Sequence, residues 1–362
     1  MGAAIILALI LGLAFANGAN DVSKGIATLV GSGVTDYRRA VAWGSLWTVA
    51  GGVLASLLAS ELAATFSGRG LLAVAPESQA FLVAVASGAI GWLAIATLTG
   101  LPVSTTHALL GGLVGAGIAA DGFGGVVWAA VAKKVALPLA VSPVLSLGLM
   151  GASLPVIRLA FRRLNGYCVC VERRELVLAT AGGATLRTGG HSLAVVTGAD
   201  CPPQVISRVN AMDSLHWLSA GLTSLLRGLN DAPKMLALGL VAAAGSVSGQ
   251  SLYVLVALAM GAGSYVAGSR VTATLAGKVT KLSPDDGFAA NLVTSVLVGV
   301  ASQFSLPVST THVSSSAVIG VGMHRGDVRW RMVRDMALAW LVTVPLAGVV
   351  AAAAYSVAGL WR

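Results

Sequence analysis

The chain has 362 residues, of which 56% are hydrophobic and only 10% are charged. Soluble domains carry about 25% charged residues, so this chain lacks the charged shell that a soluble enzyme of its length requires. The composition excludes the secreted disulfide-rich and disordered classes and predicts a polytopic protein of the lipid bilayer. The formal net charge of +9 does not indicate a nucleic-acid partner, because the basic residues lie between apolar stretches and form no stripe.

Ten apolar stretches are visible, five on each side of one longer polar segment. They cover about 3–35, 40–65, 78–98, 101–120, 123–157, 214–246, 251–268, 287–305, 306–322 and 336–360. One crossing needs about 20 residues, so the first stretch, at about 33 residues, is expected to tilt strongly, break or double back. Lys133 and Lys134 lie inside the fifth stretch, and we expect its helix to break there. The first residues are apolar without a basic leader, so no signal peptide is predicted.

The polar segment, 158–212, is expected to form a small β-rich loop domain between a first transmembrane repeat, 1–157, and a second, 213–362. Short strands are predicted at Tyr167–Val171, Leu176–Ala179 and Ser192–Thr197, split by Gly182-Gly183 and Gly189-Gly190. The segment also contains the three cysteines, Cys168, Cys170 and Cys201. Their number and spacing do not supply the four ligands of a structural zinc site, so reduced thiols are expected.

The two halves of the chain share two motifs in the same order. Gly18-Ala19-Asn20-Asp21 matches Gly228-Leu229-Asn230-Asp231, and Leu101–His107 matches Leu306–His312 without a mismatch. Two matched motifs in the same order, at similar offsets, are the signature of an internal duplication. If each half crosses the membrane five times, the halves have opposite orientations, which is the inverted-repeat plan of secondary transporters. Most of the 23 lysines and arginines then lie on the side of the polar segment, so the positive-inside rule predicts that this segment is cytoplasmic and that both termini lie outside.

The duplicated acidic motif places Asp21 and Asp231 deep in apolar stretches, each preceded by an asparagine, Asn20 and Asn230. An ionised carboxylate is costly there, so two equivalent ones indicate a functional site. Carboxylate and amide oxygens suit Na⁺, or a proton held on the aspartate. Lys24 and Lys234 follow three residues later on the same helix face.

Two interpretations of these lysines stay open. They neutralise the aspartates, or they attract an anion.

The Pro-Val-Ser-Thr-Thr-His segments predict helix starts near Ser104 and Ser309, since proline disfavours helix before it and serine caps helices well. Such starts offer free backbone N–H groups, hydroxyls and a positive dipole end, which suit a small oxyanion. The simpler alternative is that the hydroxyls only cap their own helices. The histidines that close the motifs are read as packed polar residues rather than proton carriers, and Arg227 as a boundary residue. No ATPase, protease or dinucleotide motif is present in the sequence, so no enzymatic activity and no cofactor is expected.

Together these motifs resemble the inorganic phosphate transporter family of secondary transporters. Its hallmarks are the duplicated Gly-x-Asn-Asp motif and the paired Pro-x-Ser-x-Thr-His segments, and Gly268–Val271 and Gly287–Ala290 are similar to its second half. The resemblance implies an α-helical inverted-repeat fold with broken or hairpin helices, a homodimer, and symport of phosphate with Na⁺ or H⁺ across the cell membrane. It assigns the coupling cation to Asn20, Asp21, Asn230 and Asp231. It assigns the anion to Ser104, Thr105, Thr106, Ser309, Thr310 and Thr311.

The chain departs from the family at two points. Asn291 stands where many members have glutamate, so Glu61 of the first half lacks its partner, and Lys24 replaces a small or amide residue. One branch of the family transports sulfate, which is the first alternative to phosphate. An anion channel and a phosphate-sensing receptor are the alternatives from other classes.

Overall fold

The structure is a computed structural model, described here for residues 2–58, 63, 66–74, 78–161, 167–179, 185–197, 205–242 and 249–359. The first half contains α1 (Gly2–Asp21), α2 (Ser23–Gly31), α3 (Tyr37–Leu58), α5 (Gln79–Thr99), α6 (Thr105–Asp121), a 3-10 turn (Phe123–Gly125), α7 (Trp128–Ala130), a π-helical stretch (Val131–Ala136) and α8 (Leu137–Phe161). The second half contains α9 (Ala211–Ala242), α10 (Gly249–Ala267), α11 (Ser269–Gly277), α12 (Pro284–Gln303), α13 (Thr310–Arg325) and α14 (Trp330–Gly359).

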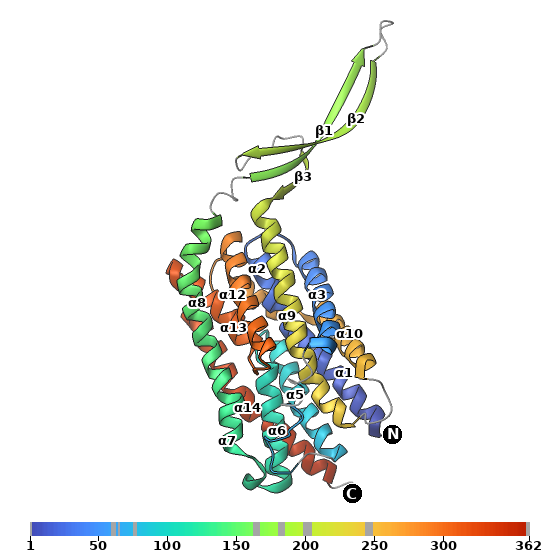
Figure 1. Ribbon diagram of the computed structural model, residues 1–362, viewed down its shortest axis with the longest axis vertical. Helices are drawn as coiled ribbons and strands as arrows, with labels where there is room; N and C mark the ends of the chain where they lie inside the picture. Colours follow the sequence, from blue (N-terminus) through green and yellow to red (C-terminus); the bar gives the residue numbers. More distant parts are fainter. Residues whose placement is uncertain are drawn as a thin grey trace.

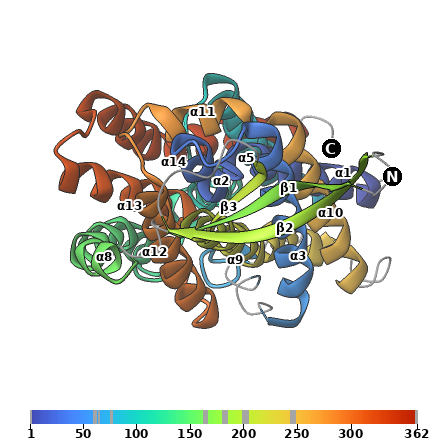
Figure 2. The same cartoon turned by 90° about the horizontal axis from the view of Figure 1, so that it is seen from above.

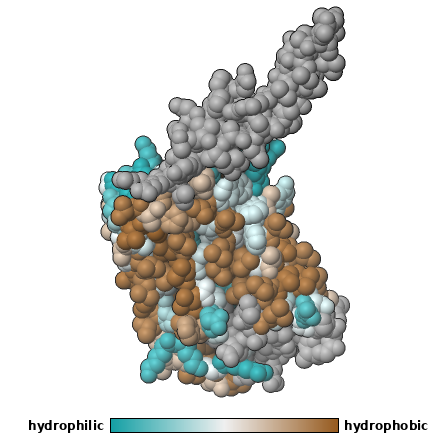
Figure 3. All heavy atoms as spheres, turned by 45° about the horizontal axis from the view of Figure 1, so that its top comes forward, coloured by the Kyte–Doolittle hydropathy of each residue, from teal (hydrophilic) through white to brown (hydrophobic). Residues whose placement is uncertain are grey.

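The helices form a bundle with an apolar outer surface. Within the described residues, six helical segments are long and apolar enough to cross a membrane: Ala4–Gly31, Tyr37–Leu57, Gln79–Thr99, Trp128–Phe161, Gly249–Ala267 and Trp330–Ala358. Large apolar side chains such as Leu57, Leu159 and Leu341 are exposed on their flanks, and Figure 3 shows this apolar belt with hydrophilic residues at both ends of the bundle. In a lipid solvent such a surface is favourable, so the chain is a multi-pass α-helical membrane protein.

One of the two predicted helix breaks is present. The first apolar stretch breaks at Val22, between the end of α1 at Asp21 and the start of α2 at Ser23. The predicted break in the fifth stretch is wrong, because the helix continues from Trp128 to Phe161 and only changes to π-helical geometry over Val131–Ala136, the segment that contains Lys133 and Lys134. Of the three outcomes expected for the first stretch, the helix breaks, and it does so beside the acidic motif.

Four of the apolar stretches are arms of hairpins, so the expectation of five separate crossings in each half is wrong. The turn between α5 and α6 is buried, with Val103 fully covered, and the turn between α12 and α13 is buried at Ser309. Asp286, at the start of α12, pairs with Arg158 near the end of α8. Val126, just ahead of α7 and the π-helical stretch that lead into α8, bridges to Leu72 in the segment before α5. The hairpins therefore enter from opposite ends of α8 and meet in the middle of the bundle (Figure 1).

Glycines of the duplicated acidic motif allow two close helix contacts. A Cβ atom on Gly18 would lie 2.0 Å from the carbonyl oxygen of Met260, where α1 packs on α10. A Cβ atom on Gly228 would lie 2.3 Å from the carbonyl oxygen of Thr48, where α9 packs on α3. Small residues at such contacts let helix backbones approach closely in a membrane. These contacts fix the segments that carry Asp21 and Asp231.

The polar segment contains three antiparallel strands in the order β2-β1-β3, with β1 at Tyr167–Ala179, β2 at Thr185–Thr197 and β3 at Val205–Asn210. They extend from the end of the bundle and lie across it in the end view (Figures 1 and 2). The expected strand break at Gly189-Gly190 is wrong, because β2 continues through both glycines while pairing with Glu175 and Arg174 of β1. Backbone pairing needs no Cβ, so two glycines do not end a strand whose partner continues. The predicted Gly182-Gly183 break and Cys201 lie outside the described residues.

Candidate ion and anion site

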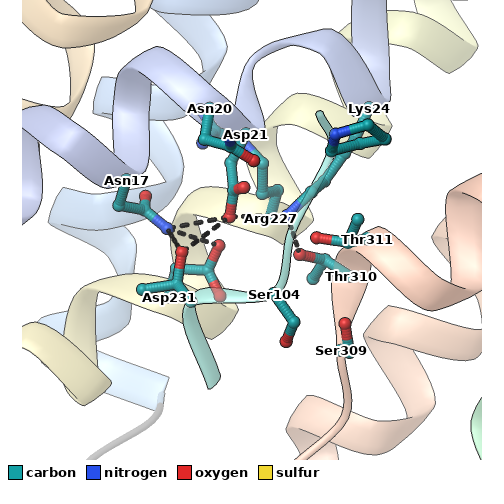
Figure 4. Close-up of polar contacts among 12 residues, drawn as sticks. Asn17, Asn20, Asp21, Lys24, Ser104, Arg227, Asp231, Ser309, Thr310 and Thr311 are labelled. Carbon is teal, nitrogen blue, oxygen red and sulfur yellow. Dashed lines mark hydrogen bonds and ion pairs between the residues drawn. The ribbon is translucent and has the colours of Figure 1, made fainter. Parts of the chain in front are cut away.

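The two aspartates of the duplicated motif lie at one site in the centre of the bundle. Asp21 at the end of α1 and Asp231 in α9 are each 1% exposed. The Asn17 side-chain nitrogen donates hydrogen bonds to both, at 2.9 Å to Asp21 Oδ2 and 3.3 Å to Asp231 Oδ2 (Figure 4). Residues 210 positions apart are thus joined by one amide.

Both predicted lysines lie in this site and contact the aspartate of their own motif. Lys24 Nζ is 2.5 Å from Asp21 Oδ2, and Lys234 Nζ is 3.0 Å from Asp231 Oδ1. Each also donates a hydrogen bond to a threonine of the opposite half, Lys24 to Thr310 at 2.9 Å and Lys234 to Thr106 at 3.0 Å. The lysines therefore connect the acidic motifs to the hairpin turns.

The predicted helix starts are confirmed. Ser104 caps α6 by accepting a hydrogen bond from the His107 N–H, and Ser309 caps α13 by accepting one from the His312 N–H. The N-terminal ends of both helices, which carry the positive end of the helix dipole, thus point into the middle of the bundle.

The hairpin turns bind each other through the threonines that follow these caps. Thr311 Oγ1 donates to the carbonyl oxygen of Val103 at 2.7 Å, and Thr106 Oγ1 donates to that of Val308 at 3.3 Å. Thr105 instead donates to Asp21 Oδ2 at 3.3 Å, and Thr310 accepts from Lys24. Three of the six predicted hydroxyl residues, Thr105, Thr106 and Thr310, therefore contact an aspartate or a lysine of the acidic motifs. The other three stay within the hairpin turns.

The asparagines of the acidic motifs attach each hairpin to its own half. Asn20 accepts a hydrogen bond from the Val103 N–H at 3.1 Å and donates to Thr97 and to the Leu101 carbonyl. Asn230 donates to Ser302 at 2.9 Å and accepts from Lys234 at 2.5 Å. Their amide groups are engaged within the protein.

Arg227 is a site residue that the sequence reading missed. The expected boundary position is wrong, because its side chain is 1% exposed in the centre of α9. It donates to Thr48 and, at 3.4 Å, to Ser264, while its Nε and Nη1 have no hydrogen-bond partner within the described part of the chain. Figure 4 places it beside Asp21, and it attracts both carboxylates. The available signal was the repeat itself, since Arg227 occupies the position of Asn17 at the same offset as the acidic motif.

The charges of the site favour an anion. Two carboxylates, from Asp21 and Asp231, face three basic groups, from Lys24, Lys234 and Arg227, and all five side chains are almost fully buried. With the groups in their ordinary ionised forms the cluster carries a net charge of about +1. A buried positive charge is costly until it is paired. A small oxyanion would supply the missing charge and accept from the unpartnered guanidinium nitrogens.

The contacts of the two lysines also decide whether Na⁺ fits at the oxygens of this site. The carboxylate, amide and hydroxyl oxygens are the ligand types that a hard cation prefers. Lysine ammonium groups already occupy them, and a cation about 4 Å from an ammonium is repelled by about 4 kcal/mol at an effective dielectric constant of about 20. The arrangement as it stands therefore does not fit Na⁺ at these oxygens.

The departure at Asn291 lies beside this site. Its side-chain nitrogen donates to Thr28 Oγ1 at 2.9 Å, and Thr28 also contacts His216 Nε2 at 3.0 Å. An amide here joins α12 to α2 without adding a charge. Glu61, its expected counterpart, lies outside the described residues.

Comparison with known proteins gives the class of this chain. The sequence profile of the phosphate transporter family matches residues 17–351. A probable low-affinity inorganic phosphate transporter of Mycobacterium bovis is 30% identical over 361 residues, covering 97% of this chain and 76% of the relative. A protein of the same name from Rhizobium meliloti is 29% identical, covering 98% and 96%. A solved structure described as the sodium-dependent phosphate transporter has the same fold, with a TM-score of 0.77, 24% identity and full coverage of both chains.

The chain therefore belongs to the phosphate transporter family. This confirms the resemblance drawn from the duplicated motifs. Members of this family are transporters, so the expectation that the chain is not an enzyme is also confirmed.

Proposed function

We propose that this protein is a secondary active symporter that carries inorganic phosphate together with a cation, Na⁺ or H⁺, across the cell membrane. The observation that carries the proposal is the cross-pairing of Lys24 with Thr310 and of Lys234 with Thr106 around two buried aspartates. It places positive charge, hydroxyl donors and helix N-termini from both halves at one point inside the bundle. The names of the curated relatives support phosphate as the anion.

In this proposal the anion binds at the hairpin turns. Its ligands are the hydroxyls of the two Ser-Thr-Thr segments, Ser104, Thr105, Thr106, Ser309, Thr310 and Thr311, with backbone N–H groups of the helix starts. Arg227 supplies the charge that the two lysine–aspartate pairs leave over. The coupling ion acts at Asp21 and Asp231, with Asn20 and Asn230 positioning the hairpins. Na⁺ would have to displace the lysine ammonium groups from these carboxylates, whereas H⁺ would not.

The proposed architecture is a pair of inverted repeats, residues 1–157 and 213–362, joined by a cytoplasmic segment at 158–212. Equivalent helices in the two halves support it: α1 packs on α10 as α9 packs on α3, and α6 packs on α14 as α13 packs on α8. The hairpins enter from opposite ends, as an inverted pair would. Both termini then lie outside the cell. A homodimer is part of the same proposal.

Uptake into proteoliposomes tests the function. Purified protein should accumulate labelled phosphate, and an inward cation gradient should raise the final level above the equilibrium value. Excess sulfate should compete weakly if phosphate is the substrate. Stronger competition by sulfate than by phosphate would make the protein a sulfate permease, whereas non-saturating flux that follows only the anion gradient would make it a channel. Tight phosphate binding without flux would indicate a receptor.

A further inference from the structure

The surroundings of Lys234 are those of a bound cation. Its ammonium group contacts four oxygens of different kinds: Asp231 Oδ1 at 3.0 Å, Asn230 Oδ1 at 2.5 Å, Thr106 Oγ1 at 3.0 Å and the Val308 carbonyl at 3.3 Å. Asp231 and Asn230 belong to the acidic motif of the second half, and Val308 to the hairpin of the same half. Thr106 comes from the hairpin of the first half. The side chain is 0% exposed, so bulk solvent does not contact it.

Lys24 occupies the equivalent place in the first half. Its ammonium lies between Asp21 Oδ2 and Thr310 Oγ1, again a carboxylate of one half and a hydroxyl of the other. Each lysine follows its aspartate by three residues. On a helix these positions are neighbours on the same face, so the ammonium group can contact the carboxylate of its own motif. The repetition makes a chance ion pair a poor explanation, since each half builds the same contact from its own residues.

We propose that Lys24 and Lys234 act as tethered cations in place of Na⁺, so that this protein transports phosphate without requiring sodium. The proposal rests on the function proposed above and specifies its coupling. An ammonium and a sodium ion need the same carboxylate oxygens, and a lysine cannot dissociate with the substrate. A fixed positive charge therefore supplies the electrostatic attraction that a bound Na⁺ would supply, while the sodium gradient does no work on the cycle.

The lysines are then specificity-determining residues for the coupling ion. Replacing them with asparagine leaves an amide oxygen and opens the space around the carboxylates. Asparagine is the shorter choice, and glutamine keeps more of the lysine's length if the asparagine variants do not fold. Lys278 is a matched control, because its side chain is exposed at the end of α11 and outside the site.

The experiment measures labelled phosphate uptake into proteoliposomes at fixed pH and clamped membrane potential, with Na⁺ or choline outside. Wild-type protein and Lys278→Asn should change less than about twofold when choline replaces Na⁺. The double variants Lys24→Asn/Lys234→Asn and Lys24→Gln/Lys234→Gln should lose uptake in choline and recover at least about tenfold when Na⁺ is added. Labelled Na⁺ should bind the folded double variants and not the wild-type protein.

The outcomes separate the two proposals. Wild-type uptake that needs Na⁺ overturns the inference and leaves phosphate transport intact. Sodium-independent wild-type uptake, with folded double variants that neither respond to Na⁺ nor bind it, overturns the role of these lysines. Folded wild-type protein that takes up no phosphate under a sodium, proton or phosphate gradient overturns the proposed function itself.

Discussion

The imidazole rings of His107 and His312 pack against each other, with ring centroids 4.6 Å apart. They close the two identical hairpin motifs, so their contact joins the halves next to the threonines. His312 also packs on Trp340, at 4.1 Å between centroids. This stack supports the interpretation of both histidines as packing residues.

Replacing these rings by another aromatic group should therefore preserve transport. His107→Phe and His312→Phe keep the ring contacts, and we expect folded protein with phosphate uptake within about twofold of wild type, a change of about 0.4 kcal/mol. Uptake driven by a proton gradient is the measurement. Loss of that uptake in a folded Phe variant would instead assign proton transfer to the histidine.

The aspartates should be indispensable for coupled uptake. Asp21→Asn and Asp231→Asn each remove a carboxylate and leave a buried lysine without its counter-charge, which costs about 3–5 kcal/mol when a buried pair is broken. We expect no accumulation of phosphate by either variant. Because part of this loss can come from stability, size-exclusion profiles and thermal midpoints are measured alongside, and the paired variant Asp21→Asn/Lys24→Gln serves as the charge-balanced control. Near-normal accumulation by both aspartate variants would remove the coupling role from these residues.

The hydroxyl residues of both hairpins should contribute to anion affinity. Thr105→Val, Thr106→Val, Thr310→Val and Thr311→Val keep side-chain shape, and Ser104→Ala and Ser309→Ala complete the series. A lost hydrogen bond to a charged group costs about 1.5–3 kcal/mol, so the half-saturation concentration should rise roughly 10- to 100-fold at about 1.4 kcal/mol per decade. The measurement is initial uptake rate against phosphate concentration. If only one hairpin responds, the shared anion site is wrong, and if neither responds, the hydroxyls serve only as caps and hairpin contacts.

The proposed orientation, with a cytoplasmic polar segment and both termini outside, predicts which residues a membrane-impermeant reagent reaches. A reporter inserted near Gly189 should be protected in intact cells, whereas tags at both termini should be labelled. Most lysine and arginine residues lie at the end of the bundle that carries the polar segment, and the positive-inside rule places that end in the cytoplasm. Comparison of intact and permeabilised cells is the measurement. Labelling of the Gly189 reporter and a terminus from the same side would contradict opposed repeats.

An ion-pair cluster at that end should make stability depend on pH. Asp286 accepts hydrogen bonds at 2.6 Å from Arg158, Arg325 and the Ser283 hydroxyl. Burial alone would raise the pKa of Asp286, but these hydrogen bonds outweigh it and hold the pKa below its ordinary value. A lowered carboxyl pKa stabilises the folded state above the unfolded value of about 3.9, and this contribution is lost as the pH falls through the folded value.

The matched variant for this cluster is Asp286→Asn. It should unfold at a lower temperature than wild type at pH 7, and the difference should shrink as the pH is lowered below about 4. Thermal unfolding in detergent across this range is the measurement. A difference that stays constant with pH would show that the carboxylate's charge does not matter there.

Local signals were enough to predict several parts of the site. The caps at Ser104 and Ser309 follow from proline and serine alone, and the burial of Asp21 and Asp231 follows from their apolar surroundings. The duplicated motifs also indicated that the acidic and hydroxyl segments act together.

The contacts across the halves could not be predicted in the same way. Which hydroxyl Lys24 reaches depends on how two hairpins meet, and Thr310 is 286 residues away. The hairpins themselves were read as separate crossings because an apolar arm that turns inside the bundle has the same composition as one that crosses it. Arg227 was misplaced for a related reason, since a lone arginine in an apolar helix is ordinarily near a boundary.

The two hydrogen bonds between the hairpin turns, from Thr106 to Val308 and from Thr311 to Val103, are reciprocal. Any movement that parts the turns, toward either side of the membrane, has to break the same pair. In the proposed symporter the barriers to outward and inward release then share this contribution. We therefore expect net flux to follow the gradients, so that loaded vesicles release phosphate as readily as empty ones take it up when those gradients are reversed.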